Sequence, residues 1–171
     1  AYPPTVDFGV REPAFYTDWR EMLTAESLDL LMVVTWSRDH SPIVIEAANR
    51  GVKAIWCEKP IANSLQATRD MIDACRKAGT VLAVNHSRRI WDGHILMREA
   101  IRNGEIGELR HLWVSCGGAR LGDLGIHFTD WMRWITGSEV AQVTAWMNPV
   151  DEPNPRDQKG EYGFADPPGA M

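Results

Sequence analysis

The chain has 171 residues, which suffices for one domain with a sizeable core or for parts of two. Hydrophobic residues make up 44% of it and charged residues 24%, a composition that excludes disordered, collagen-like and coiled-coil chains. The formal net charge is −5, no long basic run occurs and no apolar run reaches roughly 20 residues, so neither nucleic acid nor a membrane is expected as a partner.

The first half of the chain predicts alternating strands and helices. Residues 28–35 (LDLLMVVT) form a short, continuous apolar run with a pair of valines, which is typical of a strand buried on both faces of a parallel sheet. Residues 53–57 and 81–85 predict two further strands. Because helices separate these strands at the pace of βαβ units with right-handed crossovers, the sequence indicates an α/β fold.

Short polar residues, proline and glycine mark the ends of the predicted helices. Ser41 followed by Pro42 is typical of a helix start, so a helix is expected over residues 41–50. A second helix, capped by Asn63 or Ser64, is expected to run to residue 77. Thr17 is expected to cap a short helix over residues 18–24, and Gly51 and Gly79 are expected to end the two longer helices. The apolar stripe of the second longer helix is formed by Leu65, Met71, Ile72 and Cys75.

The pattern changes after Asp92. Helices are expected over residues 93–102 and 124–135, and partly exposed strands over residues 109–116 and 140–147. These strands predict an open sheet with one face in solvent, and hence the beginning of an α+β domain. The domain boundary is therefore placed near residues 88–92, which divides the chain into 1–90 and 91–171. The loop-like stretch 151–170 near the end of the chain indicates a fragment of a larger protein.

The three cysteines, Cys57, Cys75 and Cys116, are widely spaced and form no CxxC motif or disulfide framework. A reducing compartment, the cytoplasm, is the expected location. No cluster of His, Cys and carboxylate residues has the spacing of a zinc site, so no metal site is predicted. His86, His94 and His111 also have no partners at ligand spacing and are interpreted as structural.

Polar clusters follow each of the three predicted strands, at residues 35–40, 58–60 and 85–89. Because parallel strands end at the same edge of a sheet, these clusters are expected to form the rim of one cleft. A fourth cluster in the second half contains Asp123 and His127, which share a helix face at a spacing of four, with Asp130 three residues further on.

Two of these residues have a chemical use and also a plain structural interpretation. Lys59 is either a surface lysine paired with Glu58 or a group that binds a substrate hydroxyl and stabilises a developing alkoxide. His127 is either half-buried beside a capping Asp123 or a general base, since imidazole titrates near neutral pH. Asp130 is expected to support the helix or to orient His127. Spacing alone leaves these alternatives open.

The ordered set of these motifs resembles the Gfo/Idh/MocA oxidoreductases. The matching features lie between residues 16 and 146: Thr35 to His40, Glu58-Lys59-Pro60, Asn85 with Arg88 and Arg89, residues 103–107, and Asp123, His127 and Asp130 running into residues 134–137. The resemblance implies a partial Rossmann-type parallel sheet followed by the start of an α+β domain with an open sheet. Two features depart from the family pattern. The Gly-rich GxGxxG turn that seats a cofactor pyrophosphate does not occur after a strand in this sequence, and the family's acidic or basic residue that binds the adenosine ribose is missing too.

The resemblance also implies an NAD(P)-dependent enzyme that transfers a hydride between a nicotinamide, from NAD or NADP, and a hydroxyl carbon of a sugar, cyclic polyol or related compound. It implies a homo-oligomer for the full-length protein. The implied catalytic residues are Lys59, His127 and Asp123. The implied cofactor-binding residues are Thr35, Trp36, Ser37, His40, Glu58, Lys59 and Asn85.

Three alternatives remain beside this interpretation. Some relatives of the family are NAD-dependent glycoside hydrolases, which depart from the two-carboxylate scheme of most glycosidases. A non-catalytic sensor or scaffold would use the same residues for binding or assembly. The third alternative is an inert truncation, and without a phosphate-binding turn we expect the 171 residues to bind NAD weakly.

Overall fold

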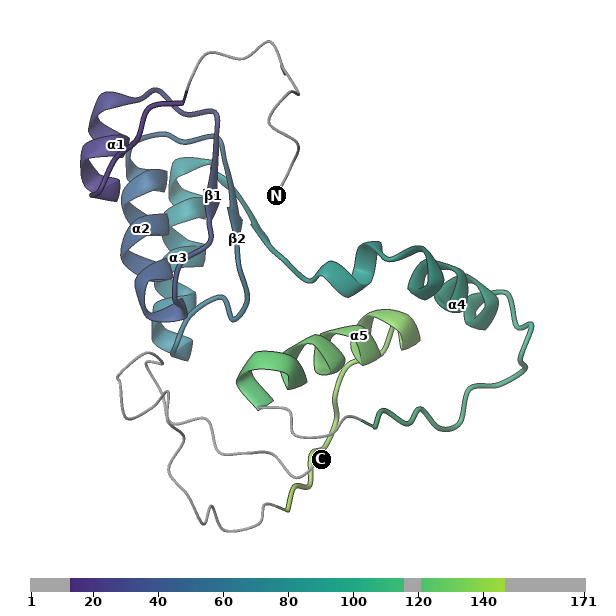
Figure 1. The fold of residues 1–171 in the computed structure, drawn as a ribbon. Coiled ribbons are helices and arrows are strands. Elements are labelled where there is room, and N and C mark those ends of the chain that lie inside the picture. Colours follow the sequence, from purple (N-terminus) through teal and green to yellow (C-terminus); the bar gives the residue numbers. More distant parts are fainter. Residues whose placement is uncertain (1–12, 116–120, 147–171) are drawn as a thin grey trace.

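A computed structural model describes residues 13–115 and 121–146, in which a three-stranded sheet lies beside helices and a separate pair of helices follows (Figure 1). None of the described helices is long and apolar enough to span a membrane. The elements are α1 (Trp19–Ala25), β1 (Leu30–Val33), α2 (Ser37–Asn49), β2 (Ala54–Cys57), α3 (Leu65–Ala78), β3 (Val81–Val84), the 3₁₀-helix η1 (Ser87–Ile90), α4 (Asp92–Arg102), the π-helical turn η2 (Leu121–Gly125) and α5 (Ile126–Thr136).

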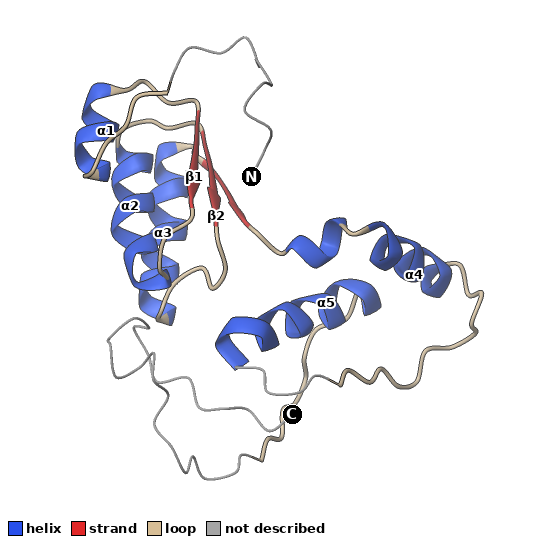
Figure 2. Ribbon diagram, viewed as in Figure 1, coloured by secondary structure: helices blue, strands red, loops and turns tan. Residues whose placement is uncertain are grey.

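The three strands form a parallel sheet in the order β1-β2-β3, which confirms the predicted βαβ alternation (Figure 2). Val33 is in register with Cys57, and Cys57 is in register with Val84. The carboxyl ends of all three strands therefore meet at one edge, from which the loops that carry the predicted polar clusters continue.

Helices α1, α2 and α3 lie on the same side of this sheet (Figure 1). Leu31, Val33, Ile55 and Cys57 point to that side and are buried against the helices. This burial of apolar surface is the main stabilising contribution to the first half of the chain.

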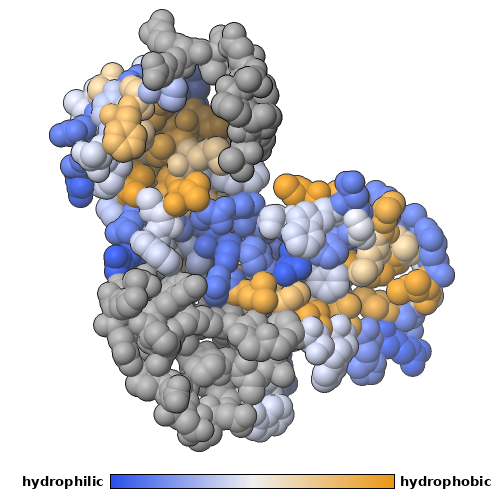
Figure 3. Space-filling view, in the orientation of Figure 1, coloured by the Kyte–Doolittle hydropathy of each residue, from blue (hydrophilic) through white to orange (hydrophobic). Residues whose placement is uncertain are grey.

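The prediction that the first strand is buried on both faces is wrong for the described residues. Leu30, Met32 and Val34 on the opposite face are 56–65% exposed. No described helix packs on that face, because all of the crossover helices lie on the other side. Figure 3 shows the resulting apolar surface over the sheet.

Helix α2 begins four residues before residue 41, where the Ser41-Pro42 pair predicted its start. It starts at Ser37, and Pro42 lies inside the helix. His40 explains the earlier start, since its fully buried ring is fixed by main-chain carbonyls of two neighbouring loops. These tertiary contacts hold residues 37–41 in helical geometry and outweigh the local signal of Pro42.

Helix α3 follows its sequence signals closely. The Ser64 hydroxyl accepts a hydrogen bond from the Ala67 amide at 3.1 Å, and Gly79 ends the helix in a left-handed conformation. Met71 and Cys75 are buried, whereas Leu65 is 76% exposed and does not belong to the apolar stripe. The N-cap of α1 is Asp18 rather than the predicted Thr17.

Helices α4 and α5 pack against each other and against η1. The strands predicted over residues 109–116 and 140–147 are absent from residues 109–115 and 140–146. These described residues have no neighbouring strand to pair with, and an unpaired extended segment is not stable as a strand. Cys116 and Met147 themselves, and the loop-like stretch 151–170, lie outside the described residues.

Candidate active site

The loop after β2 reaches the second half of the chain through Lys59. Its ammonium donates a hydrogen bond to Asp123 Oδ1 at 2.7 Å and another to the Asp123 carbonyl at 2.8 Å. The Lys59 side chain is 17% exposed, while the Asp123 side chain is 49% exposed. Two of the three predicted catalytic residues, 64 positions apart, are thus in direct contact, and a carboxylate oriented by a lysine faces partly into solvent.

A second contact joins the ends of β2 and β3. The Asn85 amide donates to Glu58 Oε1 at 2.5 Å, and Glu58 Oε2 accepts the Lys59 backbone N–H at 3.3 Å. The Lys59–Pro60 peptide bond that follows is cis. Glu58 therefore ties both strand ends together, which brings Asn85 and Lys59 to the same part of the sheet edge.

The loop after β1 contributes residues of a different kind. Trp36 is the N-cap residue of α2 and is 45% exposed, and Ser37 opens the helix. His40 is fully buried, with Nε2 2.9 Å from the Thr35 carbonyl and Nδ1 3.0 Å from the Pro60 carbonyl. This geometry favours a structural role for His40, which links the loops after β1 and β2, over direct contact with a ligand.

His127 lies in the first turn of α5, directly after the π-helical turn that carries Asp123. Its Nδ1 atom is buried without a hydrogen-bond partner among the described residues. Burial lowers the pKa of His127, and the ammonium of Lys59 and the guanidinium of Arg88 lower it further. The imidazole is therefore kept neutral near pH 7, which is the form that accepts a proton.

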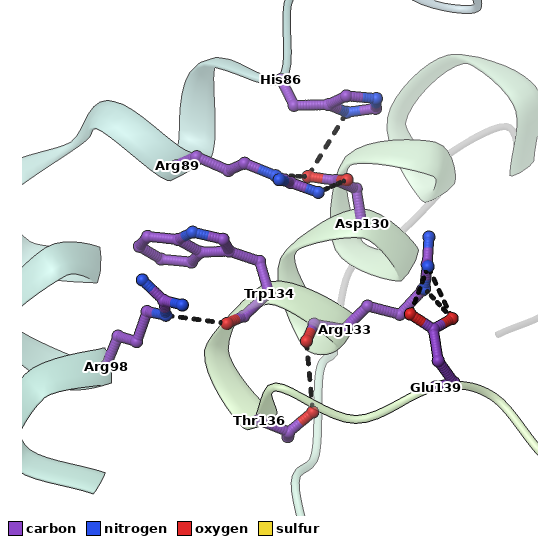
Figure 4. Close-up of polar contacts among 8 residues, drawn as sticks. All are labelled: His86, Arg89, Arg98, Asp130, Arg133, Trp134, Thr136 and Glu139. Carbon is purple, nitrogen blue, oxygen red and sulfur yellow. Dashed lines mark hydrogen bonds and ion pairs between the residues drawn. The ribbon is translucent and has the colours of Figure 1, made fainter. Parts of the chain in front are cut away.

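His86 was interpreted as structural, yet it is close to His127. The two ring centroids are 6.4 Å apart in an edge-to-face arrangement. His86 Nδ1 lies 3.5 Å from Asp130 Oδ2, and both oxygens of Asp130 accept hydrogen bonds from Arg89, at 2.8 and 2.5 Å (Figure 4). Asp130 thus binds Arg89 rather than His127. In the sequence, only the polar cluster at residues 85–89 indicated that this segment would lie near α5.

Aromatic rings surround the other arginine of this cluster. The Arg88 guanidinium lies 4.3 Å from the Phe128 ring centroid and 5.2 Å from that of Trp91. His94 Nδ1 donates a hydrogen bond to the Arg88 carbonyl at 2.9 Å, and the His94 ring stacks on Trp91 with the ring centroids 5.2 Å apart. These contacts fix η1 against α4 and α5, and no sequence spacing pointed to them.

A cavity of about 330 Å³ opens beside the site. It lies next to the exposed side of β2 and β3 and contains polar side chains from the end of β3 and from η1. Its lining residues are Trp56, Val84, Asn85, His86, Arg89 and Ile90. Lys59 and His127 do not line it, but His86 borders both the cavity and His127.

The arrangement is suited to proton transfer at a hydroxyl group. Lys59 supplies a cation for an oxygen that develops negative charge, and His127 supplies a neutral base. No group of three or more His, Cys, Asp and Glu side chains in the described ranges is placed to hold a metal ion.

Two family models match the chain. One, described as "Oxidoreductase family, NAD-binding Rossmann fold", matches residues 5–86, and the other, "GFO/IDH/MocA C-terminal domain", matches residues 94–166. These matches and the parallel sheet show that the chain belongs to the Gfo/Idh/MocA oxidoreductase family, with a Rossmann-like fold in its first half.

Individual relatives agree with this assignment. The chain is 29% identical to a myo-inositol 2-dehydrogenase of Thermotoga maritima over 76% of its length and 33% identical to a D-apiose dehydrogenase of Paraburkholderia graminis over 82%. Both matches cover 42% of the relative. A solved oxidoreductase domain protein from Kribbella flavida is 30% identical, with a TM-score of 0.60 over 71% of this chain and 38% of that one. The chain thus spans about two fifths of these relatives.

Proposed function

We propose that the chain forms part of the active site of an NAD(P)-dependent oxidoreductase that transfers a hydride between a nicotinamide and a hydroxyl carbon of a sugar or cyclic polyol. The observation that carries this proposal is the hydrogen bond between Lys59 and Asp123, which joins the sheet edge to the turn before His127. The names of the relatives, an inositol and an apiose dehydrogenase, support the substrate class.

The residues of the sheet edge fit the nicotinamide half of the cofactor. Asn85 and Glu58 offer an amide and a carboxylate, which match the hydrogen-bonding groups of a carboxamide and a ribose. Trp36 offers an exposed aromatic ring, with Thr35 and Ser37 beside it. When bound, the nicotinamide would supply the hydride acceptor or donor, which no protein side chain provides.

The pyrophosphate half does not find a comparable partner in the described residues. Every described glycine with positive φ follows the carboxyl end of a helix or lies in a turn after one, as Gly51 and Gly79 do. The loops that leave the carboxyl edge, residues 34–41, 58–64 and 85–92, contain no glycine. They therefore lack the close backbone approach that a Gly-rich phosphate loop provides.

In the oxidation direction, His127 accepts the proton of the substrate hydroxyl. The Lys59 ammonium binds the same oxygen and stabilises the negative charge that develops as the hydride leaves the adjacent carbon. Asp123 holds the ammonium in place, and its half-exposed carboxylate would lie beside the substrate hydroxyl groups. These are the roles of positioning and charge stabilisation that a protein contributes to cofactor chemistry.

The remaining features of the proposal concern the whole protein. Residues 1–90 would be the later part of the dinucleotide-binding domain and residues 91–171 the beginning of the substrate and oligomerisation domain, in line with the interval between the two family matches. A homo-oligomer in the cytoplasm remains part of the proposal, and the exposed Leu30, Met32 and Val34 give such an assembly apolar surface to bury.

The test is the formation of NADH or NADPH, followed at 340 nm, by the 171-residue chain with millimolar NAD⁺ or NADP⁺, respectively, and with myo-inositol, D-apiose or D-glucose. We expect Lys59→Met and His127→Gln each to lower kcat by about 10²-fold or more. Lys53→Met is the matched control, because Lys53 also pairs with an aspartate but is 78% exposed at the other end of β2.

Equal rates for the Lys59→Met and Lys53→Met variants would contradict the proposal, as would a lack of NADH with every substrate. Release of 4-nitrophenol from an aryl glycoside without net NADH formation would instead identify the NAD-dependent glycoside hydrolase. If both substitutions changed binding or assembly but not turnover, the chain would be a sensor or scaffold.

A further inference from the structure

Two histidine rings lie next to each other beside the proposed active site. His86, at the start of η1, and His127, in α5, lie edge to face with an interplanar angle of 86°. Both Nδ1 atoms are buried and neither makes a hydrogen bond in the described part of the chain, although His86 Nδ1 lies 3.5 Å from Asp130 Oδ2. Buried polar atoms are normally hydrogen-bonded, so a buried His127 Nδ1 without a hydrogen bond, beside a second imidazole, points to a function for the pair.

The charged groups around the two rings differ. The cations Lys59 and Arg88 lower the pKa of His127, while the Glu58 carboxylate raises it and Asp123 pairs with Lys59 in the turn before α5. His86 lies near Lys59, Arg89 and Glu58 as well, but its nearest charged group is the Asp130 carboxylate at 3.5 Å. Asp130 therefore compensates a positive charge on His86, whereas the cations beside His127 oppose a positive charge on that ring.

The two rings also differ in their access to solvent. His86 lines the cavity of about 330 Å³, together with Asn85 and Arg89, whereas His127 does not line it. A cavity of this size with polar walls holds several waters. One water between the rings is compatible with their centroid distance of 6.4 Å.

We propose that His86 is a positioning residue that holds the ring of His127 and transfers the proton of His127 to the cavity. The inference rests on the proposed function, in which His127 accepts that proton from the substrate. The substrate O–H bond breaks and an N–H bond forms on His127. One proton then passes from His127 through a water molecule to His86, and from His86 to solvent in the cavity. No group changes its oxidation state in this step. During reduction of a carbonyl the route runs in reverse.

Arg89 and Asp130 support this role. The bidentate pairing holds Asp130 in one orientation and keeps its Oδ2 atom directed at His86 (Figure 4). Asp130 is 9% exposed, so its charge is weakly screened by solvent. Loss of the Asp130 charge should therefore make His86 a poorer proton acceptor without removing either imidazole.

The first test is an NMR titration of the histidine C2–H signals in the 171-residue chain, which needs no cofactor or substrate. We expect His86→Gln to raise the pKa of His127, because the positive charge of protonated His86 opposes protonation of its neighbour. Asp130→Asn should lower the pKa of His86. His111→Gln is the control, since His111 is exposed, and it should leave both titrations unchanged. Identical His127 titrations in the wild type and in His86→Gln would overturn the proposal.

The second test measures turnover with myo-inositol, D-apiose or D-glucose under the conditions of the dehydrogenase assay. His86→Ala should lower kcat by about tenfold with little change in KM, and added imidazole should restore most of the loss through the cavity. His94→Ala is the packing control, because His94 stacks on Trp91, and imidazole should not restore any rate that it loses. A loss in His86→Ala that imidazole does not restore would overturn the proton-transfer role.

The two tests separate the two proposals. If the wild-type chain forms no NADH, the proposed function fails, while the titration still decides whether His86 and His127 are coupled. If NADH forms and the titrations are independent of each other, the dehydrogenase assignment stands and the role of His86 fails.

Discussion

At the scale of single residues, Asp130 is a buried carboxylate that links α5 to η1. It lies on α5 and accepts two hydrogen bonds from Arg89 of η1. We expect Asp130→Asn to lower the free energy of unfolding by about 2 kcal/mol, because charged, bidentate hydrogen bonds to a buried carboxylate are lost. Urea unfolding measures this effect. Asp73→Asn is the control, since its pairing with Arg76 is highly exposed and should be worth less than about 0.5 kcal/mol. Equal effects of the two substitutions would contradict the buried-pair interpretation.

The two neighbouring histidines predict how stability depends on pH. Burial lowers the pKa of both His86 and His127 below the ordinary value of 6.5. The unfolded chain therefore binds protons first as pH falls below 6.5, and the folded chain loses stability until the pH is below the folded pKa values. Above about pH 7 both groups are neutral in both states and contribute no pH dependence. We expect the urea midpoint of the wild type to fall between pH 7.5 and 5.5.

His86→Gln removes one of the two groups, so its urea midpoint should fall less over the same interval. The comparison is made within each variant, between the two pH values, so a general loss of stability does not affect it. A urea midpoint that falls equally in both proteins would show that protonation of His86 does not contribute to the pH dependence of stability.

Single residues were predictable where a chemical use and a strand end coincided. Lys59, Asp123 and His127 were identified by the family resemblance together with their positions, because spacing alone left a structural interpretation open. The structure brings Lys59 and Asp123 into contact. His86 and His40 were not predictable in the same way. Their environments depend on carbonyls and carboxylates that are 20 or more residues away, such as the Pro60 carbonyl for His40.

At the scale of elements, the capping of α3 gives a local test. Ser64 accepts a hydrogen bond from the Ala67 amide, one of the otherwise unpaired donors of the first helical turn. We expect Ser64→Ala to lower the free energy of unfolding by about 1 kcal/mol, measured by urea unfolding. Ser64→Asp keeps an acceptor and places a negative charge at the helix N-terminus, so it should preserve the stability. If Ala and Asp were equally destabilising, the hydroxyl would contribute through packing and not as a cap.

Elements were predictable where the signals are local. The order of strands and helices from β1 to β3 follows from alternating apolar runs and helix stops such as Gly79. The extended segments 109–115 and 140–146 have strand-like composition but are not strands here. Strand formation requires a partner at the correct distance, and composition says nothing about whether one is present. The exposure of Leu30, Met32 and Val34 could not be predicted for the same reason, because burial of the second sheet face depends on what packs against it.

At the scale of the whole molecule, the parallel sheet explains why distant motifs converge. Val33, Cys57 and Val84 are in register, so the residues that follow them occupy one edge. Helices η1 and α5 then place His86, His127 and Asp130 beside that edge. Under the proposed function, this edge would receive the nicotinamide and the substrate hydroxyl group, while the described residues offer no phosphate loop.

The contrast between these two halves of the cofactor predicts how the 171-residue chain binds it. Under the proposed function, the nicotinamide half would bind at Glu58 and Asn85, whereas the described loops at the carboxyl edge contain no glycine for the pyrophosphate and adenosine halves. We expect the isolated chain to bind NADH with a Kd weaker than about 100 μM, which corresponds to less than about 5.5 kcal/mol of binding free energy. Reduced nicotinamide mononucleotide should bind within about threefold of NADH, because the additional adenylate makes few contacts.

Isothermal titration calorimetry with both compounds measures the difference directly. Asn85→Ala should weaken the two ligands by the same factor, since it acts on the part they share, while Asn63→Ala, on the loop before α3, serves as the surface control. A low-micromolar Kd for NADH together with much weaker binding of the mononucleotide would contradict the prediction. Such a result would mean that residues outside the described loops bind the adenylate half. The edge of the sheet would then not account for cofactor binding by itself.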